Sequence, residues 1–445
     1  MPHGDPMNEY LHCISQQIRW KKAHPTVLWE LKSHLQDQQQ AYIREGMDPD
    51  AAMEQAIREM GDPVTVGAQL DRVYRPRVPW GTMVTALLLT AAGFYLRFSL
   101  EQSFSPGNIL GVLFLCCAAF LGAMKLDVTV LLKTHWVYGV YLAGAVVLRF
   151  FPLPWNLSLR LTPYFLLLMA PLSCVSLMHH LRDRQIAGLW LCFGLSVIPL
   201  IVLYSTLSLL LLLEILLLML YAIFRGGFPL RSIRTQLQQA AGLCTVVLLP
   251  ILLLFLRFRE DERFDAILHP QRYPNSLGYL YLHLRKFLSM AKPLGPMEGV
   301  EQLEQYLPFS GADRLFTWSV CHFGWIPALI LPLCMVVLLT KAVLLCRKQS
   351  GFLTKLCCVS ILLTWGMQLL LSMTADLGIV LISSIPFPFL GSKLSAAVNM
   401  MLLGLLVSCF MRQGLREKSA APHTAKTRLV IRKTQNGVDF QIRWR

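Results

Sequence analysis

Long apolar stretches separated by short polar segments fill most of the chain after a polar N-terminal part. Apolar runs of about 18 or more residues are typical of membrane-spanning helices. The pattern predicts about ten such helices, although leucine-rich stretches blur the fifth and sixth, so nine or eleven also fit. The predicted spans lie near residues 79–99, 107–125, 129–150, 163–181, 187–203, 207–225, 238–257, 315–340, 352–374 and 387–411. We therefore expect an all-α, polytopic membrane protein preceded by a small soluble domain.

The N-terminal part, residues 1–77, has the pattern of a small helical domain. Apolar residues recur at helical spacing over 14–35, and cap-type residues precede a second helix over 51–60. The run Met60-Gly61-Asp62-Pro63 marks the end of this helix, because Gly followed by Pro is common at helix ends. A third helix is expected over 64–73. Residues 1–77 are thus predicted to form a soluble three-helix unit.

Lysine and arginine in the short loops predict the orientation of the membrane part, residues 78–412, because cytoplasmic loops carry an excess of these residues. With the N-terminus inside, the inner loops are rich in them. The short outer loops near 100–106, 204–206 and 375–386 have none. An even number of spans with both ends cytoplasmic fits this distribution. The one large outer loop is then 258–314, and a loop of that length is usually functional.

The basic tail, residues 413–445, contains a hairpin signal. Asn436-Gly437 lies between two segments of alternating polarity, which is a strong short-range indication of a β-hairpin. A lone hairpin is only marginally stable. We expect it to lie on anionic lipid through its arginines and Trp444.

Composition narrows the function classes. The chain is 55% hydrophobic and 15% charged, with a formal net charge of +15. In a membrane protein this excess is explained by cytoplasmic loops, so no nucleic-acid partner is expected. Most of the 12 cysteines lie in apolar runs, and no pair has metal-ligand spacing with histidines, so they are interpreted as packing residues.

The large loop and the last outer segment carry an ordered set of residues. In the loop they are Arg263, Pro270, Pro274, Gly278, Tyr279, Tyr306, Leu307, Pro308, Asp313, Phe316 and Gly324. Toward the last span they are Gln368, Ser372, Gly378, Pro386, Pro388, Phe389 and Ser395. Their order resembles that of the shape, elongation, division and sporulation (SEDS) family, the RodA, FtsW and SpoVE glycosyltransferases of bacterial cell walls. The resemblance covers about 80–412, and Gly378, Pro386, Pro388 and Phe389 form its structural motif.

The resemblance implies a glycosyltransferase that polymerises lipid II, an undecaprenyl-pyrophosphate-linked substrate, at the outer face of the bacterial cell membrane. It implies that Asp313 is the catalytic base, with Mg²⁺ or Mn²⁺ as a candidate cation there. The candidate substrate-binding residues are Arg285, Lys286, Arg314, Tyr279 and Gln302. The arginines suit bidentate phosphate contact, although ordinary solvated charges on an amphipathic outer helix would look the same. A class B penicillin-binding protein is the implied partner.

The chain departs from the family pattern at several positions. Paired family glutamates fall on Cys321 and His322, and the family's Glu-His-Thr falls on Phe309, Gly311 and Ala312. A non-catalytic scaffold or regulator of cell-wall synthesis is therefore the alternative function. A lipid or solute transporter is a weaker alternative, because the chain has no internal repeat. The process served, whether cell shape, division or sporulation, stays open.

Three further features of the sequence bear on function. Residues 8–74 resemble the permease prefix domain of bacterial membrane proteins, which implies protein binding or self-association. Glu214 interrupts the apolar run of the sixth span, and an ionisable residue at membrane depth suggests a function, although a hydrogen-bonded glutamate at a helix interface is the simpler interpretation. His179 and His180 end the fourth span without convergent ligands, so we expect interface residues there.

Overall fold

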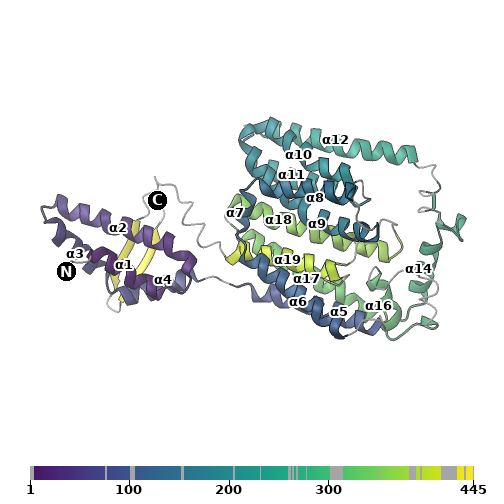
Figure 1. The fold of residues 1–445 in the computed structure, drawn as a ribbon, viewed down its shortest axis with the longest axis horizontal. Coiled ribbons are helices and arrows are strands. Elements are labelled where there is room, and N and C mark those ends of the chain that lie inside the picture. Colours follow the sequence, from purple (N-terminus) through teal and green to yellow (C-terminus); the bar gives the residue numbers. More distant parts are fainter. Residues whose placement is uncertain are drawn as a thin grey trace. The chain divides into compact units, whose positions relative to one another are not determined.

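The fold is seen in a computed structural model of the chain (Figure 1). It describes residues 5–75, 78–100, 106–151, 155–203, 206–230, 232–258, 262, 265–266, 269–276, 278–300, 314–349, 351–379, 387–390, 393–411, 428–434 and 437–443. The chain divides into two compact units. One unit comprises Met1–Val78 with Met411–Arg445, and the other comprises Pro79–Phe410.

The smaller unit has four α-helices where three were expected. They are α1 (Pro6–Gln17), α2 (His24–Arg44), α3 (Pro49–Met60) and α4 (Pro63–Tyr74), with the short η1 (Lys21–Ala23) before α2. The continuous apolar periodicity over 14–35 was interpreted as one helix. The chain instead leaves the helical conformation at Ile18, and Pro25 lies in the first turn of α2, where a missing N–H costs nothing.

Three of these helices begin in the same way, with an aspartate followed by proline. The carboxylates of Asp5, Asp48 and Asp62 accept hydrogen bonds from first-turn N–H groups, as N-cap residues do. Gly61 ends α3 with φ +92°, which confirms the helix end predicted at Gly-Asp-Pro. The apolar faces meet in one core around Ile14, which is fully buried.

The tail forms a two-stranded antiparallel sheet. Strand β1 (Arg428–Thr434) pairs with β2 (Gly437–Arg443), and Thr434 lies opposite Gly437. The two strands are joined through 435–436, so Gly437 of the predicted Asn-Gly turn is the first residue of β2. Trp444 and both of those connecting residues are outside the described residues.

The larger unit is a bundle of long helices (Figure 1). Each predicted span overlaps one of them. They are α5 (Trp80–Leu100), α6 (Pro106–Lys125), α8 (Trp136–Phe150), α9 (Trp155–Leu181), α10 (Gln185–Leu203), α11 (Thr206–Phe224), α12 (Ile233–Phe258), α17 (Trp325–Arg347), α18 (Phe352–Asp376) and α19 (Lys393–Met411). The short α7 (Val128–Leu132) precedes α8, and η2 (Arg182–Arg184) joins α9 to α10.

Length and hydropathy alone identify five membrane-spanning stretches within the described residues, and the longest, Thr162–Leu203, includes both α10 and most of α9. Four shorter apolar helices lie in α5, α6, α8 and α11. The chain is therefore a multi-pass, all-α membrane protein, as the hydrophobic pattern predicted.

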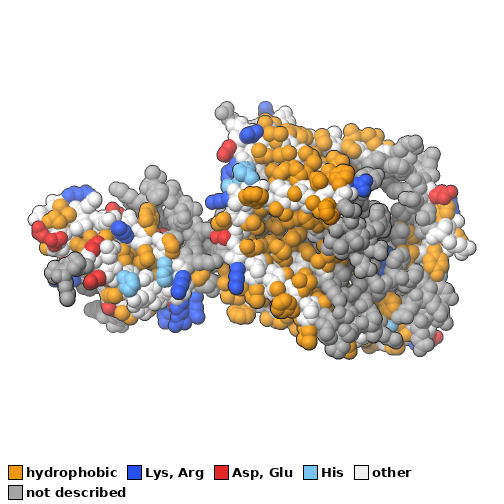
Figure 2. Space-filling model, viewed as in Figure 1, with side chains coloured by type: hydrophobic (Ala, Val, Ile, Leu, Met, Phe, Trp, Pro, Cys, Tyr) orange, Lys and Arg blue, Asp and Glu red, His pale blue; other side chains and the backbone are white. Residues whose placement is uncertain are grey.

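Burial separates the interior helices from the lipid-facing ones. In the apolar window of α19, 78% of residues are buried inside the protein, against 17% for α12. Hydrophobic side chains cover most of the visible surface of the larger unit, with few charged ones among them (Figure 2). A surface of this kind is stable only against hydrocarbon.

The large loop contains two described helical elements, η3 (Pro270–Arg272) and α14 (Tyr279–Met290), and α16 (Leu315–Phe323) follows it. The last of these corrects the predicted eighth span, 315–340. The chain forms α16, breaks at Gly324 and only then begins α17.

Candidate active site

Helix α14 is the amphipathic stretch that the sequence predicted within the large loop. Tyr281, Leu284 and Leu288 are on its buried side, at helical spacing. Arg285 and Lys286 are exposed on the other side. The helix therefore packs by one face and presents two adjacent cations by the other.

A polar pocket of about 480 Å³ lies beside this exposed face. Its lining residues are His269, Pro270, Gln271, Leu282, Arg285, Lys286 and Ser289. Within the described part of the chain, neither cation of the pocket has a carboxylate partner at ion-pair distance, and Asp265 is engaged with Arg272 at 3.1 Å. Among these described residues, the pocket therefore combines two cations that have no acidic partner with hydrogen-bonding side chains, which suits an anionic ligand.

Arg285 also ties α14 to the end of α18. Its Nε donates a hydrogen bond to the carbonyl oxygen of Gly378 at 3.2 Å. Gly378 has φ +65°, a left-handed conformation that glycine adopts without a steric cost. The predicted structural motif residue Gly378 and the predicted binding residue Arg285 are therefore in direct contact.

The segment after α14 runs along the junction of α16 and α17. The N–H groups of Gly295 and Met297 donate to the carbonyls of Phe323 and Cys321, at 3.0 and 2.9 Å. Gly324 adopts φ +93°, and a Cβ there would lie 2.7 Å from the carbonyl oxygen of Pro293. Only glycine fits this junction without displacing the neighbouring chain.

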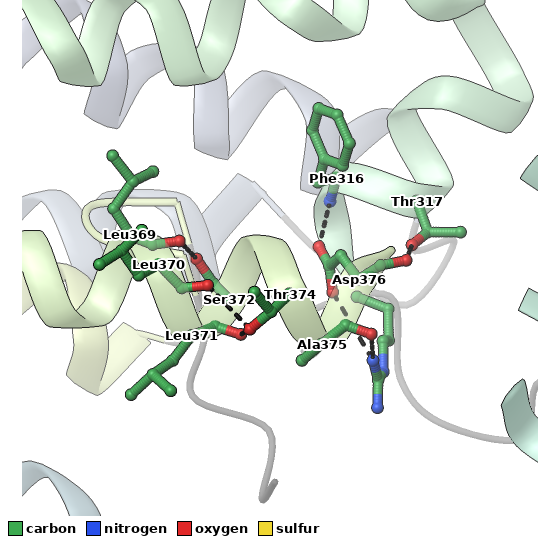
Figure 3. Close-up of polar contacts among 10 residues, drawn as sticks. Phe316, Thr317, Leu369, Leu370, Leu371, Ser372, Thr374, Ala375 and Asp376 are labelled. Atoms are coloured by element: carbon green, nitrogen blue, oxygen red, sulfur yellow. Dashed lines mark hydrogen bonds and ion pairs between the residues drawn. The ribbon is translucent and has the colours of Figure 1, made fainter. Parts of the chain in front are cut away.

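The start of α16 is fixed to the end of α18 by a buried ion pair between Arg314 and Asp376. Figure 3 shows the contacts of Asp376 with Phe316 and Thr317. Arg314 and Asp376 are 6% and 2% exposed, and their charged groups approach to 4.0 Å. The Arg314 guanidinium also donates to the carbonyl oxygen of Ala375. Asp376 accepts a hydrogen bond from the N–H of Phe316 at 3.1 Å, and its carbonyl accepts one from the Thr317 hydroxyl at 2.7 Å.

Pro388 and Phe389, two residues of the predicted structural motif, lie in a buried turn over 387–390. Pro388 is buried, and Phe389 is 1% exposed with φ +66°, which a non-glycine residue rarely adopts. The ring of Phe389 packs against Trp365 of α18, with centroids 5.4 Å apart. These residues shape the packing before α19.

The family glutamate positions hold uncharged or weakly basic groups here. Cys321 is fully buried, and burial raises the pKa of its thiol to about 12, which disfavours the thiolate form. The ring of His322 stacks on Trp318 with centroids 5.2 Å apart. Neither residue replaces a carboxylate chemically.

The predicted site residues thus fall into three groups. Arg285 and Lys286 share the pocket, whereas Arg314 is buried in the ion pair and the ring of Tyr279 packs at a tilt against His283 with centroids 3.9 Å apart. Neither Arg314 nor Tyr279 lines the pocket. The remaining predictions, Asp313, Gln302 and Pro386, lie outside the described residues.

Sequence reasoning missed Asp376 and the pocket residues His269, Gln271 and Ser289. Asp376 had a usable signal, because it is an acidic residue at the end of an apolar span. The three pocket residues had no such signal in the sequence, because the residues that line a pocket are decided by the path that the loop takes.

Glu214 and His180, which were also singled out in the sequence, lie away from the large loop. Glu214 of α11 is buried, and its carboxyl accepts a hydrogen bond from the Thr364 hydroxyl of α18 at 2.6 Å. His180 stacks on His135, with ring centroids 3.9 Å apart, at the junction of α8 and α9. Across the described residues, no group of three histidine, cysteine or acidic side chains is arranged to hold a metal ion.

Comparison with known proteins identifies solved structures that are similar to this chain. No protein-family profile and no curated protein sequence matches the chain. Among solved structures, one similar chain comes from a peptidoglycan synthase complex studied for the coordination of polymerization and crosslinking. It has a TM-score of 0.56 and 18% identity, over 77% of this chain and 98% of that one. The crystal structure of the rod shape determining protein RodA of Thermus thermophilus has a TM-score of 0.48 and 15% identity, over 75% of this chain and 97% of that one.

Proposed function

We propose that the chain is a divergent SEDS-family protein that polymerises lipid II at the outer face of the bacterial cell membrane. The observation that carries the proposal is the shared fold with a chain of a peptidoglycan synthase complex, over 98% of that chain. The resemblance that the loop residues carry points the same way. The basic pocket on α14 supports an anionic substrate such as a pyrophosphate-linked lipid.

The proposed reaction needs a base and a phosphate contact. Asp313 removes the proton from the 4-hydroxyl of the acceptor sugar. That oxygen attacks the anomeric carbon of the donor, and the bond from this carbon to the pyrophosphate breaks with inversion. Polyprenyl pyrophosphate leaves with the bonding electrons. Arg285 and Lys286 contact its phosphates, where positive charge stabilises the negative charge that develops.

A divalent cation is not built into this scheme. The described residues offer no group of three donors for one, and Asp313 lies outside them. The proposed partner is a class B penicillin-binding protein, which would crosslink the glycan product, and the small helical unit is proposed to bind protein or to self-associate.

One observation favours a second function, a non-catalytic scaffold or regulator of cell-wall synthesis. The positions of the two family glutamates hold Cys321, a buried thiol, and His322, which stacks on Trp318. The two functions differ in whether a loop carboxylate is needed for glycan synthesis.

Asp313→Asn separates them, because it keeps the side-chain shape and removes the charge. Purified protein with a candidate penicillin-binding partner is incubated with lipid II and Mg²⁺ or Mn²⁺, and glycan is measured. Loss of a general base lowers the rate by about a hundredfold to ten-thousandfold. Asp265→Asn is the matched control, since Asp265 is a loop aspartate engaged with Arg272 and should leave the rate unchanged.

Equal glycan from wild type and Asp313→Asn would show that Asp313 is not the base. If wild type makes no glycan with any candidate partner, while Asp313→Asn still rescues a deletion phenotype, the scaffold function replaces the enzyme. A melting temperature close to that of wild type is required of each variant before its rate is interpreted.

A further inference from the structure

The proposed reaction does not use the buried carboxylate of Asp376 at the end of α18. It is 2% exposed, so it is not a contact for a substrate that arrives from solvent or lipid. A buried charge is costly unless it is paired and hydrogen-bonded. Asp376 has both kinds of partner, and all of its partners named here lie in a single short segment, 314–317.

Three attachments join that segment to the end of α18, as Figure 3 shows for Phe316 and Thr317. The Phe316 N–H lies in the first turn of α16, where helix N–H groups have no partner within the helix. Asp376 supplies the missing acceptor and places negative charge near the positive end of the helix dipole. The Arg314 side chain adds the third attachment, to Ala375 and Asp376.

Apolar packing holds the rest of α16 in the same place. Phe316 and Val320 form a small buried cluster with Leu288 of α14 and Ala328 of α17. Met373 and Leu377, at the end of α18, pack against this cluster. The polar attachments therefore join the first residues of α16 to helices that are already packed against it.

The residue directly before this anchored segment is Asp313. Consecutive Cα atoms are about 3.8 Å apart, so an anchor on Arg314 restricts where the backbone of Asp313 can lie. A displacement of about 1 Å at a reacting group can cost about a hundredfold in rate. An anchor of this kind would thus act on the chemical step.

We propose that Asp376 is a positioning residue that sets the location of Asp313 for proton abstraction, through its contacts with Arg314 and Phe316. The proposal rests on the proposed function of Asp313 as the base. Asp376 acts through the loop segment and does not touch the sugar.

The test compares two substitutions with one control in the full-length protein. Asp376→Asn keeps an acceptor oxygen for the Phe316 N–H but loses the charge opposite Arg314. Asp376→Ala loses both. Thr374→Val is the control: Thr374 lies two residues away on α18, and its hydroxyl bonds only to the carbonyls of Leu370 and Leu371 in the contacts described (Figure 3).

Two readouts are used. Hydrogen–deuterium exchange measures protection of the peptide that includes 314–320, and it requires no activity. Steady-state kinetics with lipid II separates kcat from KM. We expect faster exchange confined to this peptide, and a fall in kcat of about tenfold to a hundredfold with KM nearly unchanged, because the loss falls on the transition state. Asp376→Ala should exceed Asp376→Asn in both readouts, and Thr374→Val should match wild type.

Unchanged exchange in Asp376→Ala overturns the anchor. Faster exchange with an unchanged kcat, in a wild type that polymerises lipid II, overturns the positioning role while the proposed function stands. A fall in rate that comes through KM alone also overturns it, since that would indicate substrate binding. If wild type makes no glycan, the proposed function fails and the positioning role with it, a result that the exchange data distinguish from loss of the anchor.

Discussion

Glu214 and Thr364 form a hydrogen bond between two helices in the interior of the bundle. The donor and acceptor are 2.6 Å apart, and both side chains are buried. The Thr364 hydroxyl also bonds to the carbonyl of Ser360 in its own helix, at 3.0 Å. Thr364 therefore keeps a partner if Glu214 is changed, whereas this carboxyl oxygen loses its donor if Thr364 is changed.

We expect Glu214→Gln to be nearly neutral for stability, because the amide oxygen can still accept from Thr364. Thr364→Val keeps the shape and removes the donor. A double-mutant cycle of Thr364→Val with Glu214→Leu, which removes the acceptor, on thermal or denaturant unfolding in detergent should give a coupling of about 0.6 kcal/mol, the average for interhelical hydrogen bonds in membranes, and at most about 1.7 kcal/mol. A coupling of zero would show that the contact stabilises nothing. Failure of Glu214→Gln to support activity at normal stability would instead give Glu214 a functional role.

Residue identity predicted some contacts and not others, for a physical reason. Glu214 stands out in the sequence because charge is rare in an apolar run. Arg285 and Arg314 look alike in the sequence, as loop arginines. One lines a pocket and the other is 6% exposed in an ion pair. Burial depends on the path of the loop, and local sequence does not encode it.

The junction of α16 and α17 shows how one residue sets the geometry of two elements. The apolar pattern across 315–340 is continuous, so it predicts a single span. Gly324 breaks it with φ +93°, and the preceding loop segment occupies the space that a Cβ would need. The N–H of Trp325 then bonds to the carbonyl of Lys292 at 3.1 Å, which holds the loop against the break.

Gly324→Ala should therefore destabilise the protein by about 1–3 kcal/mol, the cost of a left-handed conformation in a residue with a Cβ. Gly366→Ala in α18 is the control, because a Cβ there meets nothing within 4 Å. Alanine at that position should be neutral or stabilising, since it is the better helix former. Melting temperatures in the same detergent test both. Equal effects of the two substitutions would contradict a special role for the Gly324 conformation.

The same limit on pattern reasoning explains the N-terminal unit. Apolar spacing predicted its helical character and the end of α3 at Gly61, but it ran across the break between α1 and α2. Periodicity reports which face is buried. It does not report a turn between two helices whose buried faces happen to remain in phase.

Contacts between helix ends give the larger unit a consistent sidedness. The Lys341 ammonium near the end of α17 donates to the carbonyl of Gly81 at the start of α5, at 3.0 Å. The Ser408 hydroxyl near the end of α19 donates to the carbonyl of Leu126, just after α6, at 2.7 Å. All four positions are expected on the cytoplasmic side. The arginine and lysine distribution and these contacts therefore agree on which helix ends share a face, and the loop with α14 lies at the opposite face.

Absolute orientation follows from the charge distribution alone, and it can be tested by labelling. Ser276→Cys lies in the large loop and Ser232→Cys just before α12, and both positions are exposed. The background carries serine in place of Cys13 and Cys117, the cysteines that are exposed among the described residues. A membrane-impermeant maleimide should label Ser276→Cys on intact cells and Ser232→Cys only after permeabilisation. The reverse pattern would invert the protein and place the pocket of Arg285 and Lys286 in the cytoplasm, where it could not meet an acceptor glycan outside. Labelling of both on intact cells would mean that α12 does not cross the membrane, which would contradict the even number of spans.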